Sequence, residues 1–130
     1  MNTVIKTITI LGILFLNLVI IGELKSQENT QDAYNKKGME FYNQGSYRDA
    51  IIEFSKAIEL NPSDSILYYN RALSYYKNNL FDEAITDFTS TIGLDPNYSR
   101  SYIGRGNAFE DKGDYSNALN DYNTALELDP

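Results

Sequence analysis

A unit of 34 residues recurs three times in register, and this period constrains the fold more than any other feature of the chain. The copies run over residues 31–64, 65–98 and 99–130. Self-similarity at a fixed spacing of about 20 to 50 residues predicts a stacked array of repeats. When the copies are aligned, aromatic residues, small residues and proline fall at shared positions: Tyr34, Tyr68 and Tyr102; Gly38, Ala72 and Gly106; Phe41, Tyr75 and Phe109; Ala50, Ala84 and Ala118; Pro62, Pro96 and Pro130.

Each unit contains two amphipathic segments with helical spacing. Tyr34, Gly38 and Phe41 stand at i, i+4 and i+7, and the later segment repeats this spacing from Ala50. Such spacing lines one face of a helix. A short break separates the segments, so we predict an all-α fold of antiparallel helix pairs. The small residues of the first helix are expected to face the alanines of the second and to let the two axes approach closely.

Turn and cap signals mark the ends of these helices. Gly45, Asn79 and Gly113 occupy the break, where a residue that tolerates the left-handed conformation ends a helix at little steric cost. Ser46 and Asp114 are predicted to cap the second helices of the outer units. The proline near the end of each unit disfavours helical geometry in the residue before it, so the second helix should end there.

The combined pattern resembles the tetratricopeptide repeat (TPR). Tyr-x2-Lys-Gly-x2-Phe, then Ala-x3-Phe-x2-Ala, then Pro are the residues that carry the resemblance, which covers residues 31–130. Lys37, Arg71 and Arg105 depart from it, since the family usually has leucine there. The resemblance implies a right-handed solenoid whose first helices line a concave groove, and family members commonly bind extended or helical peptides in that groove.

Stepping around each first helix away from its packing face gives the residues expected to line the groove. Tyr69, Leu73 and Tyr76 would form an apolar and aromatic centre that the core does not need, because Tyr68, Ala72 and Tyr75 already supply it. The alternative is that Tyr69 and Tyr76 pack against neighbouring first helices. The predicted partner-binding residues are Met39, Tyr42, Ile66, Tyr69, Asn70, Leu73, Tyr76, Arg100, Ile103 and Asn107.

The resemblance also allows a narrower function. Some family members grip the C-terminal acid of heat-shock chaperones with a carboxylate clamp of Lys, Asn and Arg. Asn70 matches one clamp asparagine, and Arg100 would replace a lysine. The rest departs from the pattern: Asn35 stands where lysine is expected, Met39 where asparagine is expected, and Gly104 where arginine is expected. We therefore do not expect a carboxylate clamp.

Residues 1–26 differ in composition from the repeats. Lys6 precedes an uncharged run, residues 7–22, rich in Ile and Leu. The run is short for a membrane span, which needs about 20 residues, and suits a secretory signal peptide. The alternatives are an uncleaved anchor formed by residues 4–22 and a buried core helix. Either of the first two predicts an extracytoplasmic location, whether periplasmic, envelope-bound or secreted. Residues 27–30 are predicted to be a short linker.

Composition argues against several classes of function. The chain contains neither His nor Cys, so the commonest general base, metal ligand and thiol nucleophile are absent. Its net charge of -7 disfavours binding to phosphate backbones. Two acidic clusters, one around Asp82 and one around Glu110, do not have the spacing of a calcium-binding loop. We therefore predict no enzyme, no cofactor, no metal and no nucleic-acid partner.

The last repeat raises the question of what covers it. Arrays normally end in a capping helix with a polar outer face, yet the final predicted helix would leave Ala118, Leu119, Tyr122 and Leu126 partly uncovered. Either the array continues, or another copy or a partner covers this face. Two functions follow: a scaffold that binds a partner's peptide in the groove, or a structural spacer that self-associates through its last repeat.

Overall fold

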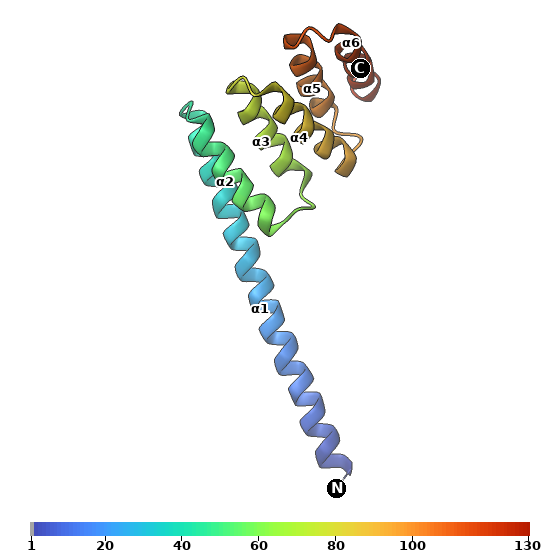
Figure 1. Cartoon of the computed structure of the whole chain (residues 1–130). Helices are drawn as coiled ribbons and strands as arrows, with labels where there is room; N and C mark the ends of the chain where they lie inside the picture. The colour runs from blue at the N-terminus through green and yellow to red at the C-terminus, as the bar shows by residue number, and fades with distance from the viewer. Residues whose placement is uncertain (1) are drawn as a thin grey trace. The chain divides into compact units, whose positions relative to one another are not determined.

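A computed structural model describes the backbone of residues 2–130 and the side chains of residues 12–26 and 30–130. The chain divides into two compact units, Met1–Thr30 and Gln31–Pro130. The boundary falls where the first repeat is predicted to begin. Six helices follow one another through residues 2–130 (Figure 1), and no strand occurs in this range.

The first helix, α1 (Asn2–Asn43), continues through residues 27–30. The predicted linker is therefore helical. This stretch contains no Gly or Pro to break a helix. Within the helix, Thr30 Oγ1 donates a hydrogen bond of 2.8 Å to the Ser26 carbonyl. Lys6, the positive charge expected ahead of the apolar run, is not among the residues whose side chains the structure describes. Among the residues that the structure describes, no helix combines the length and the apolar character needed to cross a membrane.

The second unit consists of three helix pairs. The part of α1 from Gln31 onward forms the first pair with α2. The other helices are α2 (Tyr47–Leu60), α3 (Ser65–Lys77), α4 (Phe81–Leu94), α5 (Ser99–Asp111) and α6 (Tyr115–Leu128). Each second helix ends two residues before the repeat's proline, as predicted. The all-α array of helix-turn-helix units is confirmed for this unit.

The turns inside the pairs have the predicted conformation. Gly45, Asn79 and Gly113 have φ of 77°, 60° and 80°, in the left-handed region. The Asp114 side chain caps α6 by accepting from the Asn117 N–H at 3.2 Å. The predicted cap at Ser46 is wrong, because its side chain makes no capping hydrogen bond.

Aromatic rings seal the space between the paired helices. Phe54 and Phe88 are fully buried. A Cβ at Gly38 would lie 2.6 Å from the Phe54 ring, and a Cβ at Gly106 would lie 2.6 Å from the Tyr122 ring. Such short distances are not tolerated in a packed interior. Glycine at these positions thus lets the ring of the second helix pack closely against the first helix. The atoms nearest to these glycines belong to aromatic rings and not to the alanines that the sequence predicted opposite them.

The three basic residues that depart from the TPR pattern each pair with an acid sixteen residues later. Arg71 donates from Nε and Nη2 to both oxygens of Asp87, at 2.6 and 2.9 Å. Arg105 binds Asp121 in the same way, with both distances 2.8 Å. The first repeat has a weaker version, in which Lys37 and Glu53 approach to 3.5 Å. Two hydrogen bonds between a guanidinium and a carboxylate fix orientation as well as distance.

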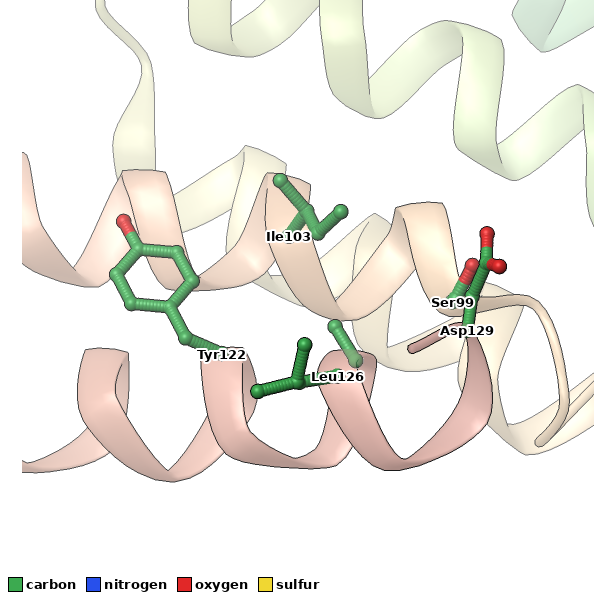
Figure 2. A pocket seen from close by; sticks show the side chains of 6 residues that line it. Ser99, Ile103, Tyr122, Leu126 and Asp129 are labelled. Atoms are coloured by element: carbon green, nitrogen blue, oxygen red, sulfur yellow. The ribbon is translucent and has the colours of Figure 1, made fainter.

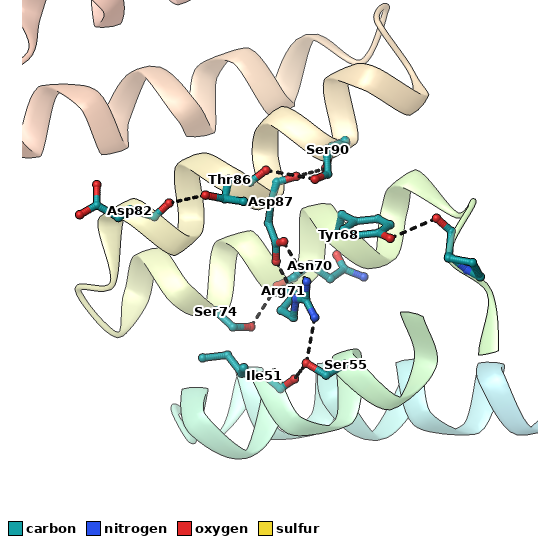
Figure 3. A network of polar contacts seen from close by, with 12 residues as sticks. Ile51, Ser55, Tyr68, Asn70, Arg71, Ser74, Asp82, Thr86, Asp87 and Ser90 are labelled. Atoms are coloured by element: carbon teal, nitrogen blue, oxygen red, sulfur yellow. Dashed lines mark hydrogen bonds and ion pairs between the residues drawn. The ribbon is translucent and has the colours of Figure 1, made fainter. Parts of the chain in front are cut away.

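The same arginines also join one repeat to the previous one. Arg71 Nη1 donates to Ser55 Oγ of α2, and Arg105 Nη1 donates to Thr89 Oγ1 of α4, both at 3.0 Å. Figure 3 shows Arg71 between the two helices that it bridges. Asp87 and Asp121 are buried. Burial, the largest single effect, would lower the pKa of Arg71, but the hydrogen bonds to Asp87 and the charge interactions with Asp87, Tyr75 and Tyr68 together raise it. We refer to these pairs and their inter-repeat bonds as the arginine ladder.

Removing an arginine of this ladder should destabilise the array. Arg71→Ala leaves the Asp87 carboxylate buried without a partner, so we expect a loss of about 3 kcal/mol in the free energy of unfolding. Urea denaturation followed by circular dichroism measures it. Lys112→Ala breaks the exposed pair with Asp82 and should cost less than about 1 kcal/mol.

A double variant separates charge burial from packing. In Arg71→Leu with Asp87→Ala no charge remains buried, so most of the lost stability should return. If this double variant is as unstable as Arg71→Ala, the buried carboxylate is not the cause.

Candidate peptide-binding groove

The first helices of the three repeats form one continuous surface with two cavities. Asn70 Nδ2 on α3 donates to Asn35 Oδ1 on α1 at 3.2 Å, and α3 also contacts α5. Leu73 of α3 lines both cavities, so they adjoin. The smaller cavity, about 20 Å³, is lined by Met39, Tyr42, Asn70 and Leu73. The larger, about 140 Å³, is lined by Tyr69, Leu73, Arg100, Ile103, Gly104 and Asn107. We call this surface the groove.

Most of the predicted partner-binding residues line these two cavities, and two do not. Ile66, in the first turn of α3, is 40% exposed but lines neither cavity. Tyr76 also lines neither. Its hydroxyl donates to Asp111 Oδ2 on α5 at 2.6 Å, and its ring lies 5.7 Å from that of Phe81. Tyr76 therefore connects α3 to α5 beside the cavities.

The expectation that the core does not need Tyr69, Leu73 and Tyr76 is wrong. These side chains pack against the buried cluster of Ala72, Ala84 and Phe88. The Tyr69 ring lies 5.8 Å from Phe88 and 5.0 Å from Tyr98. Helical spacing alone missed this contact, because the rings reach past their own helix to α4 and to the turn after it.

The polar groups of the groove are mainly neutral. Arg100 is the one charged residue that lines either cavity. It forms no ion pair with any residue that the structure describes. The Tyr122 hydroxyl, which has a single proton, lies 2.8 Å from Asn107 Oδ1 and 2.6 Å from Glu110 Oε2 and is shared between these two acceptors. The amide N–H groups of Asn107 remain to donate. The groove thus combines apolar walls with one exposed cation and amide groups.

Gly104 explains why this groove is not a complete carboxylate clamp. A Cβ at Gly104 would lie 2.4 Å from the Phe88 ring. Any side chain there, including the arginine expected of a clamp, would displace a fully buried aromatic residue. By contrast, nothing lies within 4 Å of a Cβ at Gly93. The sequence analysis named Gly104 as a position where a clamp arginine is missing but did not include it among the partner-binding residues, although its shared repeat position with Asn70 was a usable signal.

Two carboxylates of the acidic cluster around Asp82 form ion pairs with basic side chains. Asp82 pairs with Lys112 and Asp87 pairs with Arg71. Among the side chains that the structure describes, no group of three or more carboxylates is close enough together to hold a metal ion.

Two tyrosines beside the groove have a pKa that is raised to about 12. The hydrogen bond that Tyr76 donates to Asp111 is the main cause of a pKa of about 12. For Tyr122 burial comes first and the hydrogen bond to Glu110, at 2.6 Å, second, again giving a pKa of about 12. Both hydroxyls therefore stay protonated as donors at neutral pH.

Comparison with known protein families agrees with this architecture. A TPR repeat model matches residues 38–79, and a tetratricopeptide repeat model matches residues 65–98 and 99–130. The chain belongs to the tetratricopeptide repeat family. The predicted solenoid is thereby confirmed.

Several solved TPR domains are similar to this one. The second TPR domain of Spaghetti (RPAP3), bound to the HSP90 peptide SRMEEVD, is 31% identical, with 81% of this chain and 99% of that chain covered and a TM-score of 0.76. The TPR domain of Arabidopsis OM64 is 28% identical, covering 80% and 86% of the two chains, with a TM-score of 0.78.

One curated relative also matches part of the sequence. It is the Hsp70-Hsp90 organising protein of Plasmodium falciparum (isolate 3D7), 40% identical over 40 residues. The match covers 31% of this TPR protein and 7% of that relative.

Removing the Asp111 charge should change the titration of Tyr76. In Asp111→Asn the pKa of Tyr76 is expected to fall from about 12 toward its ordinary value of 10.0. Because the pKa is raised, this hydrogen bond stabilises the folded protein below pH 10, and this stabilisation is lost as the pH rises through 12. NMR of ring-labelled tyrosine measures the shift. Glu127→Gln, in the exposed last turn of α6, should leave it unchanged.

Proposed function

We propose that this protein is a non-enzymatic scaffold that binds a peptide segment of a partner protein in the groove. The observation that carries the proposal is the pair of adjoining cavities along α1, α3 and α5, with apolar walls and one unpaired cation. A concave, mostly apolar surface with a few polar groups is the usual form of a binding site. Peptide binding by a similar TPR domain, that of Spaghetti (RPAP3), supports the same use of the fold.

The lining residues favour a particular ligand chemistry. Met39 and Ile103 are 38% and 45% exposed, so both offer apolar surface to a ligand. The larger cavity has room for an apolar side chain beside the Arg100 guanidinium. Amide groups of Asn70 and Asn107 would bind the peptide backbone, since amides both donate and accept. We infer a mainly apolar segment with one carboxylate or carbonyl group facing Arg100.

This ligand differs from the peptide bound to Spaghetti. The peptide SRMEEVD has two glutamates and a terminal aspartate, which call for several cations. The two cavities here offer Arg100 alone, and Phe88 excludes a second arginine at position 104. We therefore propose a less acidic partner segment.

The groove can be tested with a library of displayed peptides selected on the full chain. The wild type should enrich a family of peptides with apolar anchors. Met39→Asp places a charge in the smaller cavity and should weaken the selected peptides by about tenfold or more, as expected when an apolar anchor is lost. Isothermal titration calorimetry measures this affinity.

A matched control is available on another helix. Ile52 on α2 is 51% exposed and lines neither cavity, so Ile52→Asp should leave affinity unchanged. Circular dichroism of both variants verifies folding. Equal loss of affinity in Met39→Asp and Ile52→Asp, or enrichment of no peptide at all, would contradict binding in the groove.

We also propose that the scaffold acts outside the cytoplasm. The support is the uncharged run of residues 7–22 behind Lys6, which is typical of an export signal. Residues 1–30 fused to alkaline phosphatase, an enzyme active only after export, should give active reporter in a bacterial host. Leu14→Arg with Leu16→Arg interrupts the run and should abolish this activity. Equal activity from both fusions would contradict an export signal.

A further inference from the structure

Opposite charges lie at the two ends of the α5 edge of the groove. Arg100, in the first turn of α5, lines the larger cavity beside Tyr69. Asp111 is the last residue of α5, and its carboxylate accepts the hydrogen bond from Tyr76. Eleven positions separate the two charges, which amounts to three turns and about 16 Å along a helix. Both charges therefore lie along one line of α5, with the larger cavity between them.

This line runs along the side of α5 that faces α3. Arg100 shares the larger cavity with residues of α3, and Asp111 is bonded to α3 through Tyr76. Figure 2 shows another side of α5, where Ile103 and Leu126 of α6 line a cavity of about 190 Å³. Neither Arg100 nor Asp111 lines that cavity. The two charges thus border the same part of the groove, between α3 and α5.

The charges of Arg100 and Asp111 are both available to a ligand. Both side chains are exposed, and neither forms an ion pair with any residue that the structure describes. The adjacent Lys112 pairs with Asp82 instead. The Tyr76 hydroxyl holds Oδ2 of Asp111 at 2.6 Å, so the carboxylate is fixed in position while its Oδ1 can accept from a cation.

The positions of these charges oppose the dipole of α5. A helix carries a partial positive charge at its N-terminus and a partial negative charge at its C-terminus, so a cation in the first turn and an anion in the last turn destabilise it. At the same repeat positions α3 carries Ile66 and Lys77, and the lysine follows the favourable pattern. A local arrangement that is unfavourable for folding is expected at functional sites.

We propose that the groove selects a partner segment with opposite charges on either side of an apolar centre. An acidic group of the segment binds Arg100, and a Lys or Arg side chain binds Asp111. This inference rests on the proposed peptide binding and adds the direction in which the segment lies. The distance of about 16 Å corresponds to about five residues of an extended chain or about eleven residues of a helix. A segment in the reverse direction brings like charges together at both ends, which disfavours it.

A charge-exchange experiment tests this direction. Peptides are selected by display on the full chain, and an enriched peptide is synthesised in its original form and with its acidic and basic residues exchanged. Asp111→Asn should weaken the original peptide by about threefold, as expected for one exposed ion pair. Asparagine keeps an oxygen that accepts from Tyr76, so this variant removes the charge and keeps the contact. Isothermal titration calorimetry measures the affinities.

A reversed variant provides the rescue. Arg100→Glu with Asp111→Lys should weaken the original peptide by about tenfold or more, because both attractions become repulsions. The exchanged peptide should bind this variant more tightly than it binds the wild type. Both substitutions agree with the dipole of α5, so the variant is expected to fold, and circular dichroism verifies it.

Glu59→Gln is the matched control. Glu59 is an exposed acid in the last turn of α2 and lines neither cavity of the groove. Its substitution changes the net charge as Asp111→Asn does and should leave affinity unchanged. Equal loss in these two variants, enriched peptides without a basic residue, or equal affinity of the original and exchanged peptides for the wild type overturns the proposal and leaves binding in the groove intact. Enrichment of no peptide contradicts groove binding, and this proposal with it.

Discussion

The arrangement of this TPR array depends on two buried arginine–aspartate pairs. Each arginine lies on a first helix, binds the carboxylate of its own second helix through two hydrogen bonds, and donates a third bond to the preceding repeat. One side chain thus sets both the angle within a pair and the register between pairs. Apolar contacts contribute more burial, but they tolerate small shifts. A guanidinium does not tolerate such shifts, because its N–H donors point in fixed directions.

This constraint reaches the groove through α3. Arg71 lies next to Asn70, which lines the smaller cavity and bonds to Asn35 of α1. On the same helix, Tyr69 rests on Phe88, and Tyr76 bonds to α5. The helix that contributes most to the groove is therefore held from several sides. A groove fixed in this way loses less conformational entropy when a peptide binds, which favours affinity.

The repeat period made the fold predictable, because aromatic, small and proline positions recur in every copy and each has a clear steric role. The left-handed turns at Gly45, Asn79 and Gly113 followed from residue type alone. The arginine ladder did not follow, since a pairing sixteen residues apart depends on how two helices face each other. Treating Arg71 and Arg105 as mild departures from an apolar pattern overlooked the buried acids at the matching positions.

The location of the groove could be predicted from the sequence, but not which of its side chains are available to a ligand. Stepping around the first helices identified most residues that line the two cavities, since helix geometry fixes which way a side chain leaves the axis. Helix geometry does not show which aromatic rings remain free of contacts with the core. Tyr69 and Tyr76 extend to α4 and α5, and part of each side chain packs against the core. Substituting them would therefore disturb folding and binding together. Met39 and Arg100 line the groove and lie outside the buried clusters, so their substitution reports on binding without disturbing the core.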